Sequence, residues 1–435
     1  MNRLNTYILT LCISCFSHSI YANTFKTEQW RTKNGVRVIF YQAKEVPMLD
    51  INLAFVAGSA YDRDNYGLSN FTTQMINEGS LGKTATTIAE ELADTGSKIN
   101  LENSRDMVVF SLRTLTSPEA LSQSTRLFSD IISHPDFPED SFTQEKKQIL
   151  MAIAHSEESA DNVAINTFFK NLYKDHPYGH SVNGTTSSVE AITRHQIVDF
   201  YHQYFIAENA VLVLVGAIDK QKAYQISELI TQDLSRGTPA SPIPEAEQIN
   251  KSEQINSAFP SSQTIIRMGQ IGIKHNNSQY FPLMVGNYIL GGGTLVSRLG
   301  DEVREKRGLT YGISSLFTPM LGNGPFIISL STKNEEAANA LKITEDTLKL
   351  FIKNGPTPHE LDAAKSYLTG SFPLSLGSNS AIASLLMRMA FYHLPDNYLD
   401  TYPAKINAVT INDIMRAFKE QVQTDKLLIV KVGQP

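Results

Sequence analysis

The sequence predicts an α+β fold of two tandem homologous domains, each a mixed β-sheet with helices packed on one face. Short apolar runs typical of strands alternate along the chain with amphipathic stretches typical of helices. The stretch 191–201 is similar to 408–418, at an offset of 217 residues. The same offset relates Val215-Gly216 to Val432-Gly433, and each pair ends an apolar run. A repeat of roughly 200 residues indicates two copies of one fold.

The composition is that of a folded protein with room for more than one core. The chain has 435 residues, of which 42% are hydrophobic, and its formal net charge is -6. Lys and Arg form no long runs, so the charge pattern favours neither nucleic acid nor an anionic membrane surface as a partner. We therefore expect two or more domains, each with a sizeable core.

Residues 1–22 have the pattern of a secretory signal. Arg3 precedes the apolar run 7–16, and Ala22 supplies a small residue at the expected cleavage point. The apolar run is too short for a membrane span, so we expect a periplasmic or otherwise exported chain, without a transmembrane span once mature. Both cysteines lie in this segment, which leaves the mature chain no disulfide and no thiol nucleophile. Lipidation of Cys15 is a minor alternative, because the residues around it match a lipidation signal poorly.

The first domain is predicted to span residues 23–234. Residues 36–41, entered through the Asn34-Gly35 turn, and the alternating run 50–56 are expected to pair as strands of one sheet. Apolar residues at helical spacing then predict a helix through 68–75. The sequence further predicts a helix at 86–95, strands at 98–103 and 107–115, a helix that opens at 117–119 and is broken at 134–138, and a long helix from 139 to beyond 153.

A polar, proline-punctuated linker is predicted at 235–262, and the second domain at 263–435. There, the glycine run 291–293 precedes a predicted helix whose apolar stripe is Leu295, Leu299 and Val303. Strands are predicted at 310–317 and 325–332. The glycine run lacks the Gly-Lys-Ser/Thr ending of a phosphate-binding loop and has no dinucleotide-binding unit before it. We therefore interpret it as a flexible or close-packed turn.

One predicted helix has the outline of a zinc site without its ligands. An inverted zinc-peptidase motif, H-x-x-E-H, places two histidines four residues apart on one helical face, beside a glutamate that activates metal-bound water. In the stretch 67–75 these positions hold Asn70, Thr73 and Gln74. Neutral amides and a hydroxyl supply neither an imidazole ligand nor an anionic base. We therefore expect this helix to bind no zinc.

The remaining histidine clusters are weaker candidates for a metal site. Their spacing fits solvated helix ends or surface residues better than a set of ligands. No G-x-S-x-G nucleophile elbow is present either. The clusters that we interpret in this way are His155 with Glu157 and Glu158, His176 with His180, and His195 with His202.

Several short motifs, taken in order, resemble the pitrilysin/insulinase family of zinc peptidases, especially its two-domain members of the mitochondrial processing peptidase type. They lie at 57–59, 67–68, 175–179, 184–185, 290–299 and 303–311 and so cover nearly the whole mature chain. Each motif is weak alone, and the order, the spacing and the internal duplication together make the resemblance strong. It implies a processing-peptidase-like fold in both domains.

The resemblance also implies where the zinc site would lie. The two histidine positions fall on Asn70 and Gln74, and the catalytic glutamate position falls on Thr73. The third ligand, a glutamate in the family, falls on Ala152, or on Met151 if the register shifts by one. All four positions lack the required side chain, which is the pattern of a non-catalytic subunit whose partner holds the zinc.

A second implied feature is retained. Arg304 and Tyr311, seven residues apart, match an arginine and a tyrosine that the family's second domain extends toward the substrate carbonyl at the zinc site. A guanidinium and a phenol can orient a peptide and stabilise a developing oxyanion. When the domains belong to different chains, these donors act at the partner's metal. The alternative from the residues alone is that Arg304 is a cation at a helix C-terminus and that Tyr311 packs in a strand.

These observations predict an exported, non-catalytic subunit of a heterodimeric zinc peptidase, inactive by itself as a metallopeptidase. It would bind no cofactor itself, its homologous partner would bind zinc, and its peptide substrate would add as a strand to a sheet edge such as 97–103. The alternative is a stand-alone peptide-binding or scaffold protein of the same fold. A hydrolase with a relocated metal site is least expected, because no other histidine cluster has suitable spacing.

Overall fold

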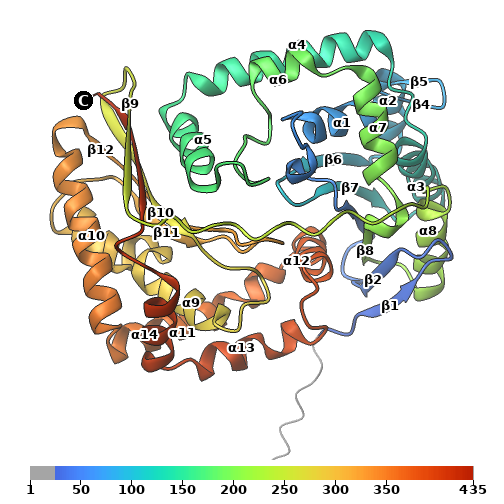
Figure 1. Cartoon of the computed structure of the whole chain (residues 1–435). Coiled ribbons are helices and arrows are strands. Elements are labelled where there is room, and N and C mark those ends of the chain that lie inside the picture. Colours follow the sequence, from blue (N-terminus) through green and yellow to red (C-terminus); the bar gives the residue numbers. More distant parts are fainter. Residues whose placement is uncertain (1–24, 435) are drawn as a thin grey trace, which may run out of the picture.

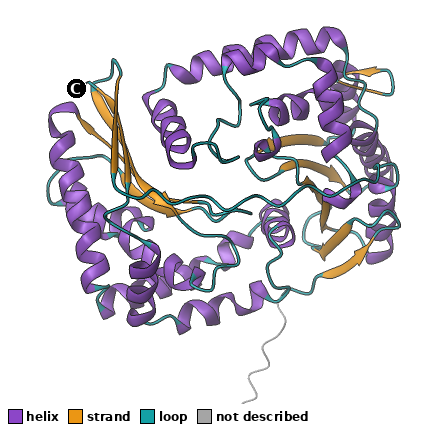
Figure 2. Ribbon diagram, viewed as in Figure 1, coloured by secondary structure: helices purple, strands orange, loops and turns teal. Residues whose placement is uncertain are grey.

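The structure, a computed structural model, describes residues 25–434. The predicted signal segment 1–22, with Cys15, lies outside the described residues. The α+β fold of two similar halves is confirmed, with a large sheet and its own set of helices in each half (Figures 1 and 2). Among residues 25–434, no helix combines the length and the apolar character needed to cross a membrane.

The first half builds a mixed six-stranded sheet. In spatial order its strands are β1 (Glu28–Arg31), β2 (Arg37–Gln42), β8 (Ala210–Gly216), β3 (Met48–Phe55), β7 (Val108–Leu115) and β6 (Lys98–Asn103). β2 and β3 are strands of one sheet, as expected, but their direct pairing is wrong because β8 lies between them, parallel to β2 and antiparallel to β3. β8 is buried along almost its whole length, so it gains most by lying inside the sheet.

The helices of the first half agree with the periodic apolar pattern. α1 and α4 begin one or two residues from the predicted starts, and α4 extends beyond Ile153 as expected. A two-stranded ribbon, β4 (Gly79–Ser80) and β5 (Lys83–Thr84), precedes α2. The helices are α1 (Leu68–Ile76), α2 (Ala85–Asp94), α3 (Pro118–Ser133), α4 (Glu139–Glu157), α5 (Ala160–Tyr173), α6 (Thr186–Ala191), α7 (Arg194–Tyr204) and α8 (Lys220–Thr231).

The second half repeats this topology in a five-stranded sheet. Its spatial order is β9 (Glu253–Ala258), β13 (Leu428–Gly433), β10 (Gln263–Ile271), β12 (Pro325–Lys333) and β11 (Ile313–Phe317). β13 is parallel to β9 and antiparallel to β10, as β8 is to β2 and β3. β9 lies within the range predicted as a linker, because its alternating half-buried residues fit a sheet edge. β11 begins at Ile313, three residues later than predicted.

The helices of the second half include two that begin at the sites of the sequence repeat. Thr193 caps α7 and Thr410 caps α14, each through a reciprocal capping box, and the two positions are related by the repeat offset. The duplication seen in the sequence is therefore a duplication of structure. The helices are α9 (Tyr280–Asn287), α10 (Ala337–Asn354), α11 (Pro358–Ser371), α12 (Asn379–Phe391), α13 (Tyr398–Ala408) and α14 (Ile411–Gln421).

The two halves exchange one helix each. α12, from the second half, packs on β8 and β3 of the first sheet, and α5, from the first half, packs on β13 and β10 of the second (Figure 1). Alternate residues of one strand consequently belong to different cores: Val38 joins the core around α1, and Ile39 joins the core around α12. Each sheet thus has its own helices on one face and a helix of the other half on the opposite face.

The predicted helix after the glycine run is wrong in part. Leu299 and Val303 are buried as expected, but Leu295 is 58% exposed. A 3-10 turn at Thr294–Val296 and a separate π-helical turn at Gly300–Glu305 replace one continuous helix. The break follows from the close approach of Gly300, where a Cβ would lie 2.2 Å from the Thr294 carbonyl oxygen.

Glu360, at the start of α11, joins this helix to the segment that follows the glycine run. Its carboxylate accepts hydrogen bonds of 2.6 and 2.7 Å from the Arg298 guanidinium and further bonds from the N–H and hydroxyl of Thr357. Burial by itself would raise the pKa of Glu360. The hydrogen bonds and charge of Arg298, with the Thr357 donors, overcome burial and lower this pKa to about 2.

Replacing Glu360 by Gln is expected to lower the free energy of unfolding by about 2 kcal/mol near neutral pH. Because the folded-state pKa lies below its ordinary value of 4.5, this stability is present above that value and is lost as the pH falls toward 2. Urea midpoints of the wild type and Glu360→Gln should therefore converge in this window. Glu345→Gln, which removes an exposed pair with Lys349, is the control and should change little. A gap between midpoints that is independent of pH would contradict the assignment.

Candidate functional site

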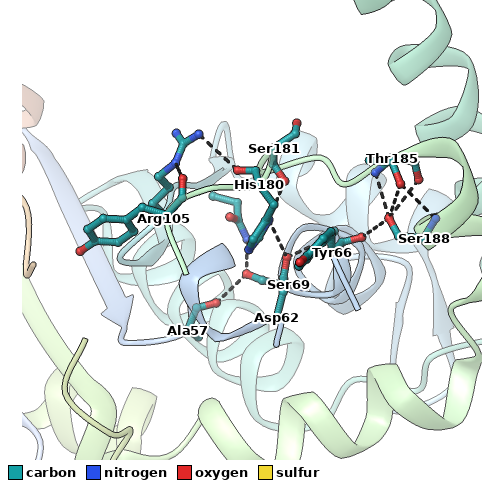
Figure 3. Close-up of polar contacts among 12 residues, drawn as sticks. Ala57, Asp62, Tyr66, Ser69, Arg105, His180, Ser181, Thr185 and Ser188 are labelled. Atoms are coloured by element: carbon teal, nitrogen blue, oxygen red, sulfur yellow. Dashed lines mark hydrogen bonds and ion pairs between the residues drawn. The ribbon is translucent and has the colours of Figure 1, made fainter. Parts of the chain in front are cut away.

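The helix α1 is fixed by a buried carboxylate at its N-terminus. Asp62 accepts hydrogen bonds from the backbone N–H groups of Gly67 and Ser69, both at 2.7 Å (Figure 3). A negative charge is favourable at this end of a helix. Burial raises the pKa of Asp62, and the two N–H donors oppose that rise. Gly67 has a φ of 93°, and a Cβ there would lie 2.8 Å from the Asn183 carbonyl oxygen, so the turn into α1 requires glycine.

Thr73, at the position of the catalytic glutamate, is part of a buried hydrogen-bond network. Its hydroxyl donates to the Ser69 carbonyl at 2.8 Å and accepts from the Asn103 side-chain amide at 3.1 Å. The same amide donates to the Ser69 hydroxyl, which donates in turn to the Ala57 carbonyl. This network ties α1 to the end of β6. Asp62 and Asn103 carry no motif in the sequence, so sequence reasoning missed both.

Asn70 and Gln74, at the two histidine positions, are half-buried on one side of α1. Ala152, at the third ligand position, and Met151 beside it are exposed on α4. The two helices pack directly, with the Phe71 and Phe142 rings stacked at a centroid separation of 5.2 Å. The helical frame expected for the zinc site is therefore present, and its metal-binding side chains are replaced.

The donor set does not fit zinc. Among residues 25–434, no group of three or more His, Cys, Asp or Glu side chains is arranged to hold a metal ion. Glu145 of α4 lies near Glu78, and burial together with the Glu78 charge raises the pKa of Glu145. Two carboxylates without an imidazole are not the ligand set of a zinc peptidase. No reaction step is derived through a metal in this chain.

The histidines near this site have structural partners. His176 accepts from the Tyr178 backbone N–H through Nδ1 at 3.1 Å, so Nε2 carries the proton and donates to the Pro244 carbonyl at 3.0 Å. His180 stacks on Tyr66 with ring centroids 4.4 Å apart (Figure 3). Burial lowers the pKa of both imidazoles. His155 pairs with Glu158 at 3.3 Å on an exposed helix end, as the sequence predicted.

Arg304 and Tyr311 lie on either side of a turn at Gly308. Arg304 is in the last turn of the π-helical segment Gly300–Glu305, and its guanidinium lies 3.5 Å from the Glu305 carboxylate. Tyr311 is 85% exposed and lies outside β11, so the interpretation of Tyr311 as a strand-packing residue is wrong. The phenol projects from the loop between the π-helical turn and β11.

Comparisons with known proteins agree with this geometry. The family model "Insulinase (Peptidase family M16)" matches residues 37–186, and "Peptidase M16 inactive domain" matches residues 191–368. The solved M16 inactive domain from Pseudomonas fluorescens is 36% identical, with a TM-score of 0.91, and the match covers 94% of this chain and 98% of that chain. The "Non-peptidase homolog YmxG" of Helicobacter pylori is 26% identical over 426 residues, 96% of each chain.

The duplicated α+β fold and the replaced zinc ligands define an inactive homologue of a zinc peptidase. The chain belongs to the M16 peptidase family, the insulinase family. Relatives described as zinc proteases also match; the Bacillus subtilis "Uncharacterized zinc protease YmxG" is 23% identical over 392 residues, 89% of this chain and 93% of that protein.

Proposed function

We propose that the chain is the non-catalytic subunit of a heterodimeric peptidase and pairs with a homologous chain that holds zinc. The observation that carries the proposal is the combination of a retained α1–α4 frame with replacement of both histidine positions, the base position and the third ligand position. The loss of a single ligand would leave a weakened site. The replacement of all four leaves a chain of this fold without its own chemistry, for which a zinc-bearing partner supplies the reaction.

Arg304 and Tyr311 would supply donors to the partner's site. The Tyr311 ring is 85% exposed, which an aromatic side chain of a folded protein seldom is without a binding role. Arg304 is about one-third exposed and keeps donors free beyond its contact with Glu305. A phenol and a guanidinium on one loop suit a peptide carbonyl whose oxygen becomes negative during hydrolysis.

The test uses the complex purified with its zinc-bearing homologue. Tyr311→Phe is expected to lower the kcat of the pair by about 100-fold, as loss of one oxyanion donor does elsewhere, and Arg304→Ala is expected to lower kcat/KM by a similar factor. Arg307→Ala and Tyr367→Phe are matched controls, because both residues are exposed in the same half. Peptidase rates equal to those of the controls would exclude these roles.

The stand-alone alternative has one observation in its favour. β6 lies at the edge of the first sheet, so one side of this strand has backbone groups available to an added peptide strand. A chain that purifies without a zinc-bearing homologue, binds peptide and lacks peptidase activity would favour this alternative. Co-purification with such a homologue in one-to-one ratio, and activity that requires both chains, would support the subunit proposal.

We also propose export, because residues 1–22 have the pattern of a secretory signal. The expected mature chain begins at Asn23 and is found in the periplasm or an equivalent compartment. Intact-mass measurement of the chain from fractionated cells checks this. A cytoplasmic chain that retains Met1 to Ala22 would contradict it.

A further inference from the structure

A cavity of about 640 Å³ lies between the two halves. No described residue of α1 or α4 lines it, so it is separate from the vacated zinc position. Its volume is in the range of about 300–1,000 Å³ that is usual for small-ligand sites. Both sheets and α12 contribute to walls that are mainly apolar, with side chains such as Met107, Val109, Leu283, Met284, Phe317 and Met387.

The first polar feature of this cavity is Arg388, on α12. Its guanidinium makes no hydrogen bond or ion pair with any of residues 25–434, although its charge acts on His275 and Tyr392. Every other arginine beside an acidic residue in the second half, such as Arg298, uses that carboxylate. An unpaired guanidinium in an apolar cavity is a ready donor fork for a ligand carboxylate.

His275 stands beside this guanidinium as an uncharged group. Its ring lies 3.8 Å from the Tyr392 ring, between centroids, and its Nδ1 is buried without a hydrogen-bond partner among the described residues. Burial and the Arg388 charge lower the pKa of His275 to about 4, so the imidazole is neutral at physiological pH. The Tyr392 hydroxyl is held by Asp106 at 3.0 Å, which fixes the ring against which His275 packs. This end of the cavity therefore has a net positive charge and an unused polar nitrogen.

The second polar feature is Glu102, on the edge strand β6. The next residue, Asn103, bonds to Ser69 and Thr73 of α1 on one face of the sheet. Successive strand residues face opposite sides, so Glu102 faces the cavity. Glu102 has no ion pair among the described residues, with Arg388 or with any other cation. The cavity thus carries one unpaired positive and one unpaired negative group on separate walls.

We propose that this cavity binds a short apolar peptide with free termini, with its carboxylate on Arg388 and its ammonium group on Glu102. The apolar walls would take the peptide side chains, and Asn52 and Ser111 offer polar groups to its amides. A fatty acid would satisfy Arg388 but would leave Glu102 and these polar groups against hydrocarbon, which is unfavourable. The inference uses this chain alone and does not depend on a peptidase partner.

The test is isothermal titration calorimetry of the purified chain with Leu-Ala-Phe-Leu, its C-terminal amide, its N-acetyl form and decanoate. The free peptide should bind, and amidation or acetylation should each weaken binding by roughly tenfold or more. Arg388→Met should weaken binding of the free peptide by a similar factor and abolish the difference between acid and amide. Glu102→Gln should abolish the difference between the free and acetylated N-termini.

The controls separate a local effect from loss of the fold. Arg388→Lys keeps the charge and should retain part of the affinity, and Lys353→Met removes an exposed cation outside the cavity and should change nothing. Thermal melts should show each variant folded, since Arg388 and Glu102 make no printed internal contact that their loss would break. Equal binding of acid and amide, absence of peptide binding, or decanoate binding as tight as that of the peptide would each overturn the proposal.

Discussion

Asp106→Ala is expected to lower the free energy of unfolding by about 3–5 kcal/mol, because it removes a buried carboxylate on which three donors converge. Asp106 accepts from the Tyr178 hydroxyl at 2.5 Å, from the Tyr392 hydroxyl at 3.0 Å and from the Leu321 N–H at 2.9 Å. Tyr178 also accepts from the Gly322 N–H. These groups come from both halves, so the carboxylate joins the loop before β7 to α12 and to the loop before β12.

Without the carboxylate, two buried hydroxyls and one N–H lose their acceptor and have no water to replace it. Burial raises the pKa of Asp106, and the three donors oppose that rise. Urea unfolding followed by the fluorescence of Trp30, the one tryptophan, would report the first half, and circular dichroism would report both. Both transitions should shift, because the same contact holds the two halves together.

Tyr392→Phe is the matched control for this prediction. It removes one hydroxyl donor and leaves the carboxylate bonded to Tyr178 and Leu321, so we expect a loss of about 1 kcal/mol. Asp106→Asn, which keeps an acceptor oxygen, should lie between the two variants. Unfolding of Asp106→Ala at the midpoint of Tyr392→Phe would show that the converging contacts contribute no more than a single hydrogen bond.

The sequence supports the fold well where the interactions are local or repeated. α1 follows from Leu68, Phe71 and Met75 at helical spacing, and the repeat offset predicts the shared topology that β8 and β13 later show. The insertion of β8 between β2 and β3 was not predictable in this way, because parallel pairing with a strand far along the chain leaves no local pattern. The exchange of α5 and α12 has the same cause: amphipathic helices show an apolar face without naming the sheet that it covers.

The vacated site was predictable in position because a motif fixes it, even when each of its residues is replaced. Its surroundings were not predictable. Asp62, Asn103 and Asp106 are single polar residues whose partners lie in other segments, and only the folded chain brings these together. Exposure of Tyr311 also depends on where β11 begins, which a shift of three residues changes.

The triple variant Asn70→His, Gln74→His, Ala152→Glu is expected to bind one zinc ion per chain. Asn70 and Gln74 are four residues apart on α1, which packs against α4 where Ala152 lies. Two imidazoles and one carboxylate are the ligand set of a catalytic zinc site with one open position. Metal analysis after dialysis against zinc is the measurement. The control carries Ala152→Gln in place of Ala152→Glu, has nearly the same size, and should retain much less zinc. Equal zinc contents would show that α4 is not at ligand distance.

Addition of Thr73→Glu to the triple variant is expected to cost about 1–3 kcal/mol of stability, and the zinc ligands should tolerate it. Thr73 is fully buried, and its hydroxyl bonds Ser69 and Asn103. A longer, charged side chain must displace Asn103 or leave its amide unpaired. The four positions therefore differ: the ligand positions are half-buried or exposed and can be refilled, whereas the base position has become part of the core. If the fourfold variant unfolded at the same urea concentration as the triple variant, the Thr73 network would contribute nothing. A lower midpoint with zinc retained would show that activity can return only after Asn103 is also replaced.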